Sequence, residues 1–135
     1  MALSETIPLI EGVFHITSHR NTGAAFGILQ DGRWFFIAIT PIVLAAIVWY
    51  MPRIRDQRGA LFAFSLILGG AVGNFIDRLL QGEVVDFFDF RLINFPIFNV
   101  ADSCIVIGVI LLLLDTLREA RREKATAGLK VEDER

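Results

Sequence analysis

The chain has 135 residues, of which 54% are hydrophobic and 21% are charged, and its formal net charge is −2. The abundance of aliphatic and aromatic residues excludes a disordered chain, and a single cysteine, Cys104, excludes a disulfide-stapled secreted scaffold. The slightly acidic balance argues against a nucleic-acid-binding protein. The length is that of one domain, and long uncharged stretches make a membrane protein the leading class.

The amino-terminal segment, residues 1–33, is expected to form strand and loop outside a membrane span. Residues 13–19, Val-Phe-His-Ile-Thr-Ser-His, are rich in strand formers and follow the breaker Gly12. Turns are expected at residues 21–26 and 30–32, where Asn, Asp and Gly punctuate the chain.

Three segments are expected to cross a membrane as helices, namely residues 34–51, 60–80 and 97–117. The hydrocarbon core of a bilayer requires about 17–25 apolar residues of helix. Apolar side chains occupy every face of these segments, unlike those of an amphipathic helix in a soluble protein. Buried helices of a soluble domain are the alternative, but a chain this short could not cover three of them. We therefore predict an α-helical integral membrane protein, with one membrane-embedded domain over residues 1–117 and a small strand and loop region outside the membrane.

The charges of the loops set the expected orientation. Arginines concentrate in residues 52–59 and in the tail, residues 118–135, so both are expected to be cytoplasmic. The charged residues of the segment 81–94 are Glu83, Asp86, Asp89 and Arg91, and three of these four are acids. This segment is expected to include a second extended piece at 83–90 and to lie outside together with residues 1–33. An outer amino-terminal segment with no signal peptide leads us to expect a further span upstream of Met1. The tail is expected to extend the last helix briefly and then fray.

Ionisable and amide side chains inside membrane spans are costly and mark functional sites. Asn74, Asp77 and Arg78 share one face at the outer end of the second span, and Asn99 and Asp102 share one face at the start of the third. Asp86 is flanked by apolar residues on the extended segment between these spans. The connection from Asp86 to Asp102 is short, so these two carboxylates are expected to meet.

Two carboxylates close together can share a proton, as in aspartic proteases, where the ionised member deprotonates water and the protonated member polarises a carbonyl. The apolar neighbours of Asp86 are expected to raise its pKa, and the helix amino terminus favours the charged form of Asp102. Asp102 is thus the expected ionised partner. The competing interpretation of these two aspartates is polar packing.

The other reactive side chains favour structural interpretations. His15 and His19 are expected at the surface or in packing, and Cys104 as a small core residue. Asp77 and Arg78 are expected to form an ion pair at the membrane edge. No metal site is expected, because His and Cys clusters or grouped oxygen ligands are missing from the sequence pattern.

Three motifs resemble those of the lipoprotein signal peptidase family, also called signal peptidase II. They are Asn21-Thr-Gly-Ala-Ala-Phe26, then Gly73-Asn-Phe-Ile-Asp-Arg78 with Val84-Val-Asp-Phe87, and finally Phe98-Asn-Val-Ala-Asp-Ser103. Their order matches that of the family over nearly the whole chain, from about residue 7 to 117. Members of that family have four membrane helices, and the first helix, with its Asp-x-x-Thr/Ser-Lys motif, has no counterpart in this sequence.

The resemblance implies an aspartic endopeptidase of the bacterial inner membrane, with its site near the outer face and its carboxyl terminus in the cytoplasm. The implied substrates are lipid-modified prolipoproteins, cut just before the diacylglyceryl-modified cysteine. Asp86 and Asp102 correspond to the catalytic dyad; the positions that line or brace the site are Asn21, Asn74, Asp77, Arg78 and Asn99. The implied partners are substrate and membrane lipid, with no cofactor, no metal and no nucleic acid, and a monomer is expected.

Two alternatives remain open at this point. A truncated form or pseudoenzyme would keep the motifs without activity. A small proton- or ion-translocating protein would use intramembrane acids as a relay, although the acids here gather at one face of the membrane.

Overall fold

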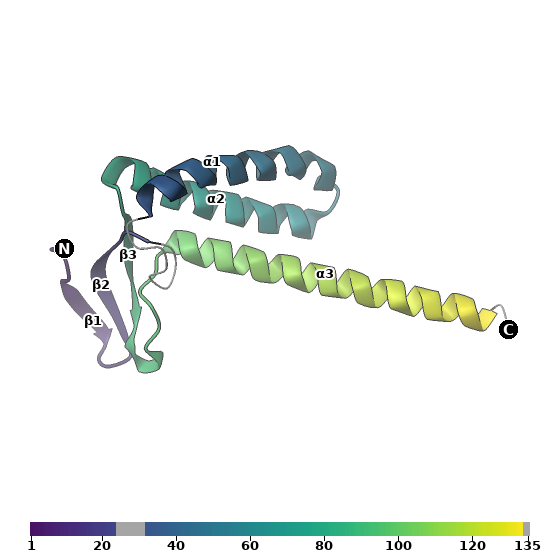
Figure 1. The fold of residues 1–135 in the computed structure, drawn as a ribbon. Coiled ribbons are helices and arrows are strands. Elements are labelled where there is room, and N and C mark those ends of the chain that lie inside the picture. The colour runs from purple at the N-terminus through teal and green to yellow at the C-terminus, as the bar shows by residue number, and fades with distance from the viewer. Residues whose placement is uncertain (24–31, 134–135) are drawn as a thin grey trace.

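The computed structural model describes residues 1–23 and 32–133, and the side chains of the last helix as far as residue 126. A small sheet lies at one end of three helices, and the last helix continues beyond the other two to the far end of the molecule (Figure 1). In chain order the elements are β1 (Thr6–Ile10), β2 (Phe14–Asn21), α1 (Arg33–Tyr50), η2 (Met51–Ile54), α2 (Arg58–Gln81), β3 (Val84–Phe90), η3 (Arg91–Ile93) and α3 (Val100–Asp133).

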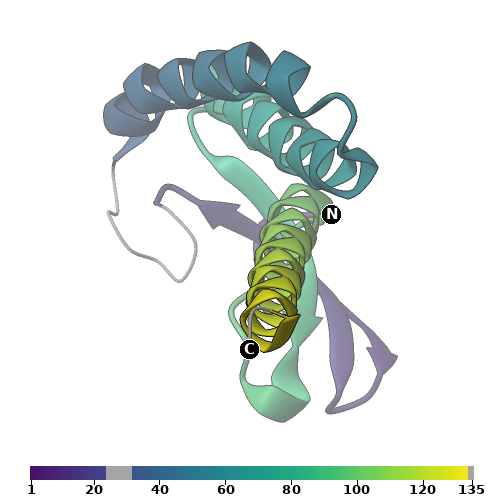
Figure 2. The ribbon, with the colours of Figure 1, turned by 90° about the vertical axis from the view of Figure 1, so that its right-hand side faces the viewer.

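Three helical segments are long and apolar enough to cross a membrane, which confirms the expected fold class of an α-helical membrane protein with a small sheet. These segments are Arg33–Ile54, Arg58–Gln81 and Val100–Thr126. Most of their large apolar side chains are exposed in the isolated chain, as lipid-facing side chains are. In the view along α3, α2 lies between α1 and α3 (Figure 2).

The sheet is antiparallel in the order β1, β2, β3, and it contains one strand that the sequence analysis did not predict. The strand β2, Phe14–Asn21, overlaps the expected residues 13–19, and β3, Val84–Phe90, overlaps the expected extended piece at 83–90; each begins one residue later than expected. The missed strand, β1, contains Pro8, which lacks a backbone donor and therefore weakens a strand prediction. An edge strand tolerates proline, and β1 forms one edge of the sheet, with a register shift between Pro8 and Ile10.

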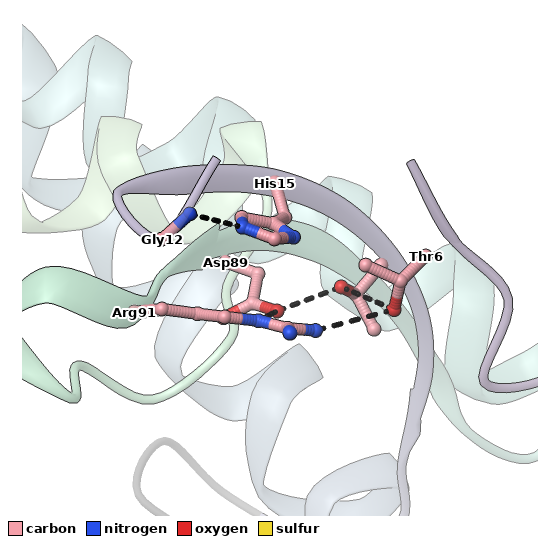
Figure 3. A network of polar contacts seen from close by, with 6 residues as sticks. Thr6, Gly12, His15, Asp89 and Arg91 are labelled. Carbon is pink, nitrogen blue, oxygen red and sulfur yellow. Dashed lines mark hydrogen bonds and ion pairs between the residues drawn. The ribbon is translucent and has the colours of Figure 1, made fainter. Parts of the chain in front are cut away.

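A polar network joins the three strands on one face of the sheet (Figure 3). Asp89 Oδ2 accepts hydrogen bonds from Thr17 Oγ1 at 2.7 Å and from Arg91 Nε at 2.9 Å. Thr6 and Thr17 are joined through their hydroxyls, and Arg91 also donates to Thr6. Burial opposes ionisation of Asp89, but the hydrogen bonds from Thr17 and Arg91 outweigh it and lower the pKa of Asp89. The Asp89 carboxylate therefore stabilises the sheet through these two hydrogen bonds.

The third helix begins at Val100, three residues later than the expected start at residue 97. The chain is still extended at Phe98, whose carbonyl accepts hydrogen bonds from the backbone N–H groups of Phe87 and Phe88. The Phe98 ring also packs on Phe88, at a centroid distance of 5.4 Å. Pairing with β3 thus holds this segment out of the helix until residue 99.

The expectation that the tail frays soon after the last span is wrong, because α3 is one helix as far as Asp133. Residues 118–130 consist mainly of Ala, Arg, Glu, Lys and Leu, which have the highest helix propensities. The other two spans differ from expectation by one or two residues at each end, since α1 is Arg33–Tyr50 and α2 is Arg58–Gln81.

The helices α2 and α3 approach closely at Gly70, which faces the first turn of α3. A Cβ added at Gly70 would collide with the carbonyl oxygen of Ala101 and lie 2.8 Å from Ile105 Cγ1. Backbone cannot move aside cheaply, so only glycine permits this approach. Gly69, on the next position of α2, has no neighbouring atom within 4 Å of an added Cβ.

Replacing Gly70 with Ala is expected to lower the thermal midpoint of unfolding, because the overpacked contact costs about 1–3 kcal/mol. Gly69→Ala is the matched control. It adds the same methyl group to the same helix in open space, and it is expected to be neutral or stabilising by about 0.5–1 kcal/mol. Thermal unfolding of both variants in the same detergent measures the difference. Equal midpoints for the two variants would contradict the close contact at Gly70.

Candidate active site

Three elements that are distant in the sequence meet where the sheet joins the helices. Asp86 comes from β3, Asn74 from α2, and Asn99 and Asp102 from the start of α3. Asp86 is completely buried, and Asn74 and Asn99 expose only 9% and 5% of their surface. Asp102 is half-buried, so one carboxylate of the expected pair can be reached from outside the protein.

The start of α3 is fixed by a reciprocal pair of hydrogen bonds between Asn99 and Asp102. Asn99 Oδ1 accepts the backbone N–H of Asp102 at 2.9 Å, and Asp102 Oδ2 accepts the backbone N–H of Asn99 at 3.3 Å. This is the arrangement of a capping box, in which the cap residue and the third helical residue satisfy each other's free donors. The backbone of α3 therefore sets the position of the Asp102 carboxylate.

Two side-chain amides connect the carboxylates of Asp86 and Asp102. Asn99 Nδ2 donates to Asp86 Oδ1 at 2.8 Å and to Asn74 Oδ1 at 3.0 Å. Asn74 Nδ2 in turn donates to Asp102 Oδ1 at 2.7 Å. A chain of hydrogen bonds thus runs from one carboxylate to the other through Asn99 and Asn74.

Asn21, at the end of β2, completes the contacts of Asp86. Its Nδ2 atom donates to Asp86 Oδ2 at 3.0 Å, and its Oδ1 accepts the backbone N–H of Gly23 at 2.9 Å. Both oxygens of the buried Asp86 carboxylate therefore accept an amide hydrogen. Residues 24–31, which hold the rest of the first motif and the turn expected at 30–32, lie outside the described part of the chain.

Arg78 ties the segment after Asn21 to α2. Its Nη2 donates to the carbonyl of Gly23 at 2.8 Å, and its Nη1 donates to the carbonyl of Asn74 at 3.3 Å. The guanidinium also lies 4.5 Å from the ring centroid of Phe36 on α1, a cation–π distance. Arg78 thus braces three elements behind the two carboxylates.

The expected ion pair of Asp77 and Arg78 is not formed, since no oxygen of Asp77 lies within 4 Å of a nitrogen of Arg78 among the contacts of these described residues. Adjacent residues of a helix do not face each other, which explains the correction. Asp77 Oδ2 instead accepts the backbone N–H of Val85 at 3.2 Å. This bond holds the start of β3, one residue before Asp86, against α2.

The burial of Asp86 raises its pKa above the ordinary value for a carboxyl group. The hydrogen bond from Asn21 favours the charged form, the nearby Asp102 carboxylate disfavours it, and the bond from Asn99 favours it again. The raised pKa agrees with the sequence-based expectation for Asp86. Of the two histidines, His15 is buried and accepts the N–H of Gly12, whereas His19 is exposed and pairs in register with Asp86 across the sheet.

A cavity of about 310 Å³ opens beside Asp102, and its wall is mostly apolar. The sequence analysis did not identify its lining. The apolar run of residues 95–98 was the only sign of this lining in the sequence, and the same run is equally compatible with the start of a helix. The lining residues are Asn21, Phe95, Pro96, Ile97, Phe98, Asp102, Ser103, Val106 and Ile107. Within residues 1–23 and 32–126, no His, Cys, Asp and Glu side chains are grouped as metal ligands would be.

Membrane-spanning helices with a buried polar cluster at one end define an integral membrane protein with a candidate active site at the edge of its spans. Residues 1–118 match the family described as signal peptidase (SPase) II. The lipoprotein signal peptidase of Brevibacillus brevis is 60% identical over 92% of this chain and 84% of its own length, and that of Bacillus subtilis is 50% identical over 92% and 82%. The chain therefore belongs to the signal peptidase II family, and it is a bacterial membrane protease.

Two solved structures of bacterial membrane enzymes have the same fold. The first has a TM-score of 0.82 and 46% identity, and the match covers 89% of this chain and 75% of that one. The second has a TM-score of 0.75 and 47% identity, with coverage of 87% and 77%. Both the family and the fold class expected from the motifs are confirmed.

Proposed function

We propose that this chain cleaves the signal peptides of prolipoproteins, just before the diacylglyceryl-modified cysteine, and that Asp86 and Asp102 activate the attacking water. The observation that carries the proposal is the pair of carboxylates joined through Asn99 and Asn74. Relatives named lipoprotein signal peptidase, at 50–60% identity, support the choice of substrate. The site lies near the outer face of the inner membrane in this proposal, and the carboxyl terminus is cytoplasmic.

The proposed reaction divides the work between the two acids. Ionised Asp102 takes a proton from water, whose oxygen attacks the scissile carbonyl carbon, while protonated Asp86 gives its proton to the carbonyl oxygen. When the tetrahedral intermediate collapses, the C–N bond breaks and the leaving amine takes the proton from Asp102. A hydroxyl of the intermediate then returns a proton to Asp86, and the site regains its starting state.

The environments of the two carboxylates support this division. Asp86 is fully buried with a raised pKa, which favours its protonated form. Asp102 is half-buried and lies in the first turn of α3, where the helix amino terminus favours a negative charge. In this proposal Asn21, Asn74, Asp77, Arg78 and Asn99 hold the acids and the surrounding chain in position.

The apolar cavity beside Asp102 supports a lipid-bearing substrate. Its volume of about 310 Å³ and its apolar wall suit an acyl chain or apolar residues next to the cleaved bond, in contact with the reachable carboxylate. Its lining includes Val106 and Ile107, which lie on α3 in the span itself. A substrate held within the bilayer can therefore approach the cavity from the lipid side.

Cleavage of a pair of synthetic peptides tests the proposed function. The chain, purified in lipid nanodiscs, is expected to cut a signal-peptide substrate that carries diacylglyceryl-cysteine and to spare the same peptide with unmodified cysteine. Mass spectrometry of the products locates the cut, which is expected on the amino side of the cysteine. Equal cleavage of both peptides, or a cut elsewhere, would overturn the substrate assignment.

A further inference from the structure

A second cavity lies at the opposite end of the helices, and the proposed reaction makes no use of it. Its volume is about 540 Å³, and it lies between the connection from α1 to α2, the first turn of α2 and the middle of α3. Tyr50, Ile54, Phe64 and Leu112 give it an apolar floor, and Ile54 is only 3% exposed. This end of the molecule is also where α1 and α2 leave the apolar part of their spans.

Three arginines and two acids line this cavity. Arg118 lies 3.6 Å from Asp115, so that pair is largely neutral. Arg58 and Arg122 have no ion-pair partner within 4 Å in the described part of the chain. The remaining acid of the lining is Glu119. Two guanidinium groups therefore stand at the cavity with their charge uncompensated by an ion pair.

The amino terminus of α2 adds hydrogen-bond donors to the same cavity. Arg58, Gly59 and Ala60 line it, and their backbone N–H groups belong to the first turn, which has no partners within the helix. The cap residue, Gln57, makes no side-chain capping bond. A Cβ at Gly59 would lie 2.6 Å from Asp115 Oδ2, so the Asp115 side chain packs against this turn.

We propose that this cavity binds the headgroup of an anionic glycerophospholipid. Arg58 and Arg122 contact the phosphate, and the acyl chains lie against the apolar floor and continue into the bilayer. A ligand with an anionic head and apolar chains complements both the arginines and the apolar side chains of the lining. With the orientation expected from the loop arginines, this lipid belongs to the cytoplasmic leaflet, on the far side of the membrane from the peptidase site. The proposal is independent of the catalytic one.

Native mass spectrometry of the full chain in detergent, titrated with phosphatidylglycerol or phosphatidylcholine, tests the proposal. We expect phosphatidylglycerol to bind more tightly, and Arg58→Gln with Arg122→Gln to weaken its binding about 30-fold, as loss of two arginines at an anionic lipid implies. The matched control is Arg55→Gln with Arg121→Gln, which removes the same charge at the same end of the molecule. Neither of those residues lines the cavity, so the control is expected to bind like the unmodified chain.

Three outcomes would overturn the proposal. Equal weakening in both double variants would mean general attraction to a basic surface, and equal binding of the two lipids would mean no selectivity for an anionic headgroup. A titration with inorganic phosphate is the third arm, and phosphate that competes fully with phosphatidylglycerol at equal concentration would mean a site for a small anion. Thermal unfolding of each variant, followed through Trp34 and Trp49, verifies that all of them are folded.

Discussion

Asp86→Asn and Asp102→Asn are each expected to lower the rate of prolipoprotein cleavage by about 10³-fold or more, as removal of a member of a concerted catalytic set does. An amide in either position keeps the size of the side chain but can neither accept a proton from water nor donate the acidic proton to the carbonyl. The double variant is expected to be no slower than the slower single variant, because the two acids act as a unit. Cleavage of a lipidated peptide by chain reconstituted in nanodiscs measures all three rates.

The matched control for this experiment is Asp89→Asn, on the same strand. Asp89 is also buried, but its carboxylate binds Thr17 and Arg91 within the sheet. Its loss is expected to lower the thermal midpoint of unfolding while the rate per folded molecule stays within about threefold of the unmodified value, as for a substitution outside the reacting groups. Retained cleavage in Asp86→Asn or Asp102→Asn would contradict the assignment of these two residues as the catalytic dyad.

Asn99→Ala is expected to be the most damaging substitution among the positioning residues. It removes the cap of α3, which costs about 1 kcal/mol, and it leaves the buried oxygen Asp86 Oδ1 without its donor, which costs about 1–3 kcal/mol. The rate of cleavage is also expected to fall, because Asp86 and Asn74 both lose a bond from Asn99 Nδ2. Thermal unfolding and peptide cleavage, measured on the same preparation, give the two effects.

Asn99→Ser separates the structural effect from the catalytic one. A serine hydroxyl also caps a helix, so most of the stability is expected to return, but Asp86 Oδ1 then lacks the amide donor that Asn99 supplied. The bond from Asn99 favours the charged form of Asp86, so its loss is expected to raise the pKa of Asp86 further. Because the reaction needs Asp86 protonated, the alkaline limb of kcat/KM is expected to move to higher pH. If the alkaline limb of kcat/KM in Asn99→Ser stayed in place while the stability fell, Asn99 would act only as a helix cap.

The sequence was sufficient to predict those parts of the fold that depend on local composition. Uncharged stretches predicted the three spans, and β-branched and aromatic residues predicted β2 and β3. Asp86 and Asp102 were selected as candidate site residues because acids at the edge of apolar spans are rare. Helical spacing predicted one shared face for Asn74, Asp77 and Arg78 and one for Asn99 and Asp102. Hydrogen bonds from Asn74 to Asp102 and from Asn99 to Asn74 join the two faces.

The features that escaped prediction depend on partners that are distant in the sequence. Gly70 is indistinguishable from Gly69 until the carbonyl of Ala101 is known to lie against it. Phe98 lies in an apolar run that is compatible with the start of a helix, but pairing with β3 keeps its backbone extended. The sequence analysis paired Asp77 with Arg78, the nearest opposite charge, whereas the Asp77 carboxylate accepts a hydrogen bond from the backbone N–H of Val85. In each case a long-range contact selects between local possibilities of nearly equal free energy.

The amide chain between the two carboxylates also isolates them from any route for protons through the membrane. Side-chain amides donate their hydrogens but keep them, so Asn74 and Asn99 can orient the acids without passing a proton onward. Below the site, residues 60–73 of α2 and 103–114 of α3 contain no ionisable side chain except the thiol of Cys104. In the proposed reaction, a proton taken from water at this site therefore meets no carboxylate, imidazole or amine in these stretches of α2 and α3. These two stretches of helix thus offer the proposed acid pair no carboxylate, imidazole or amine as a relay into the membrane.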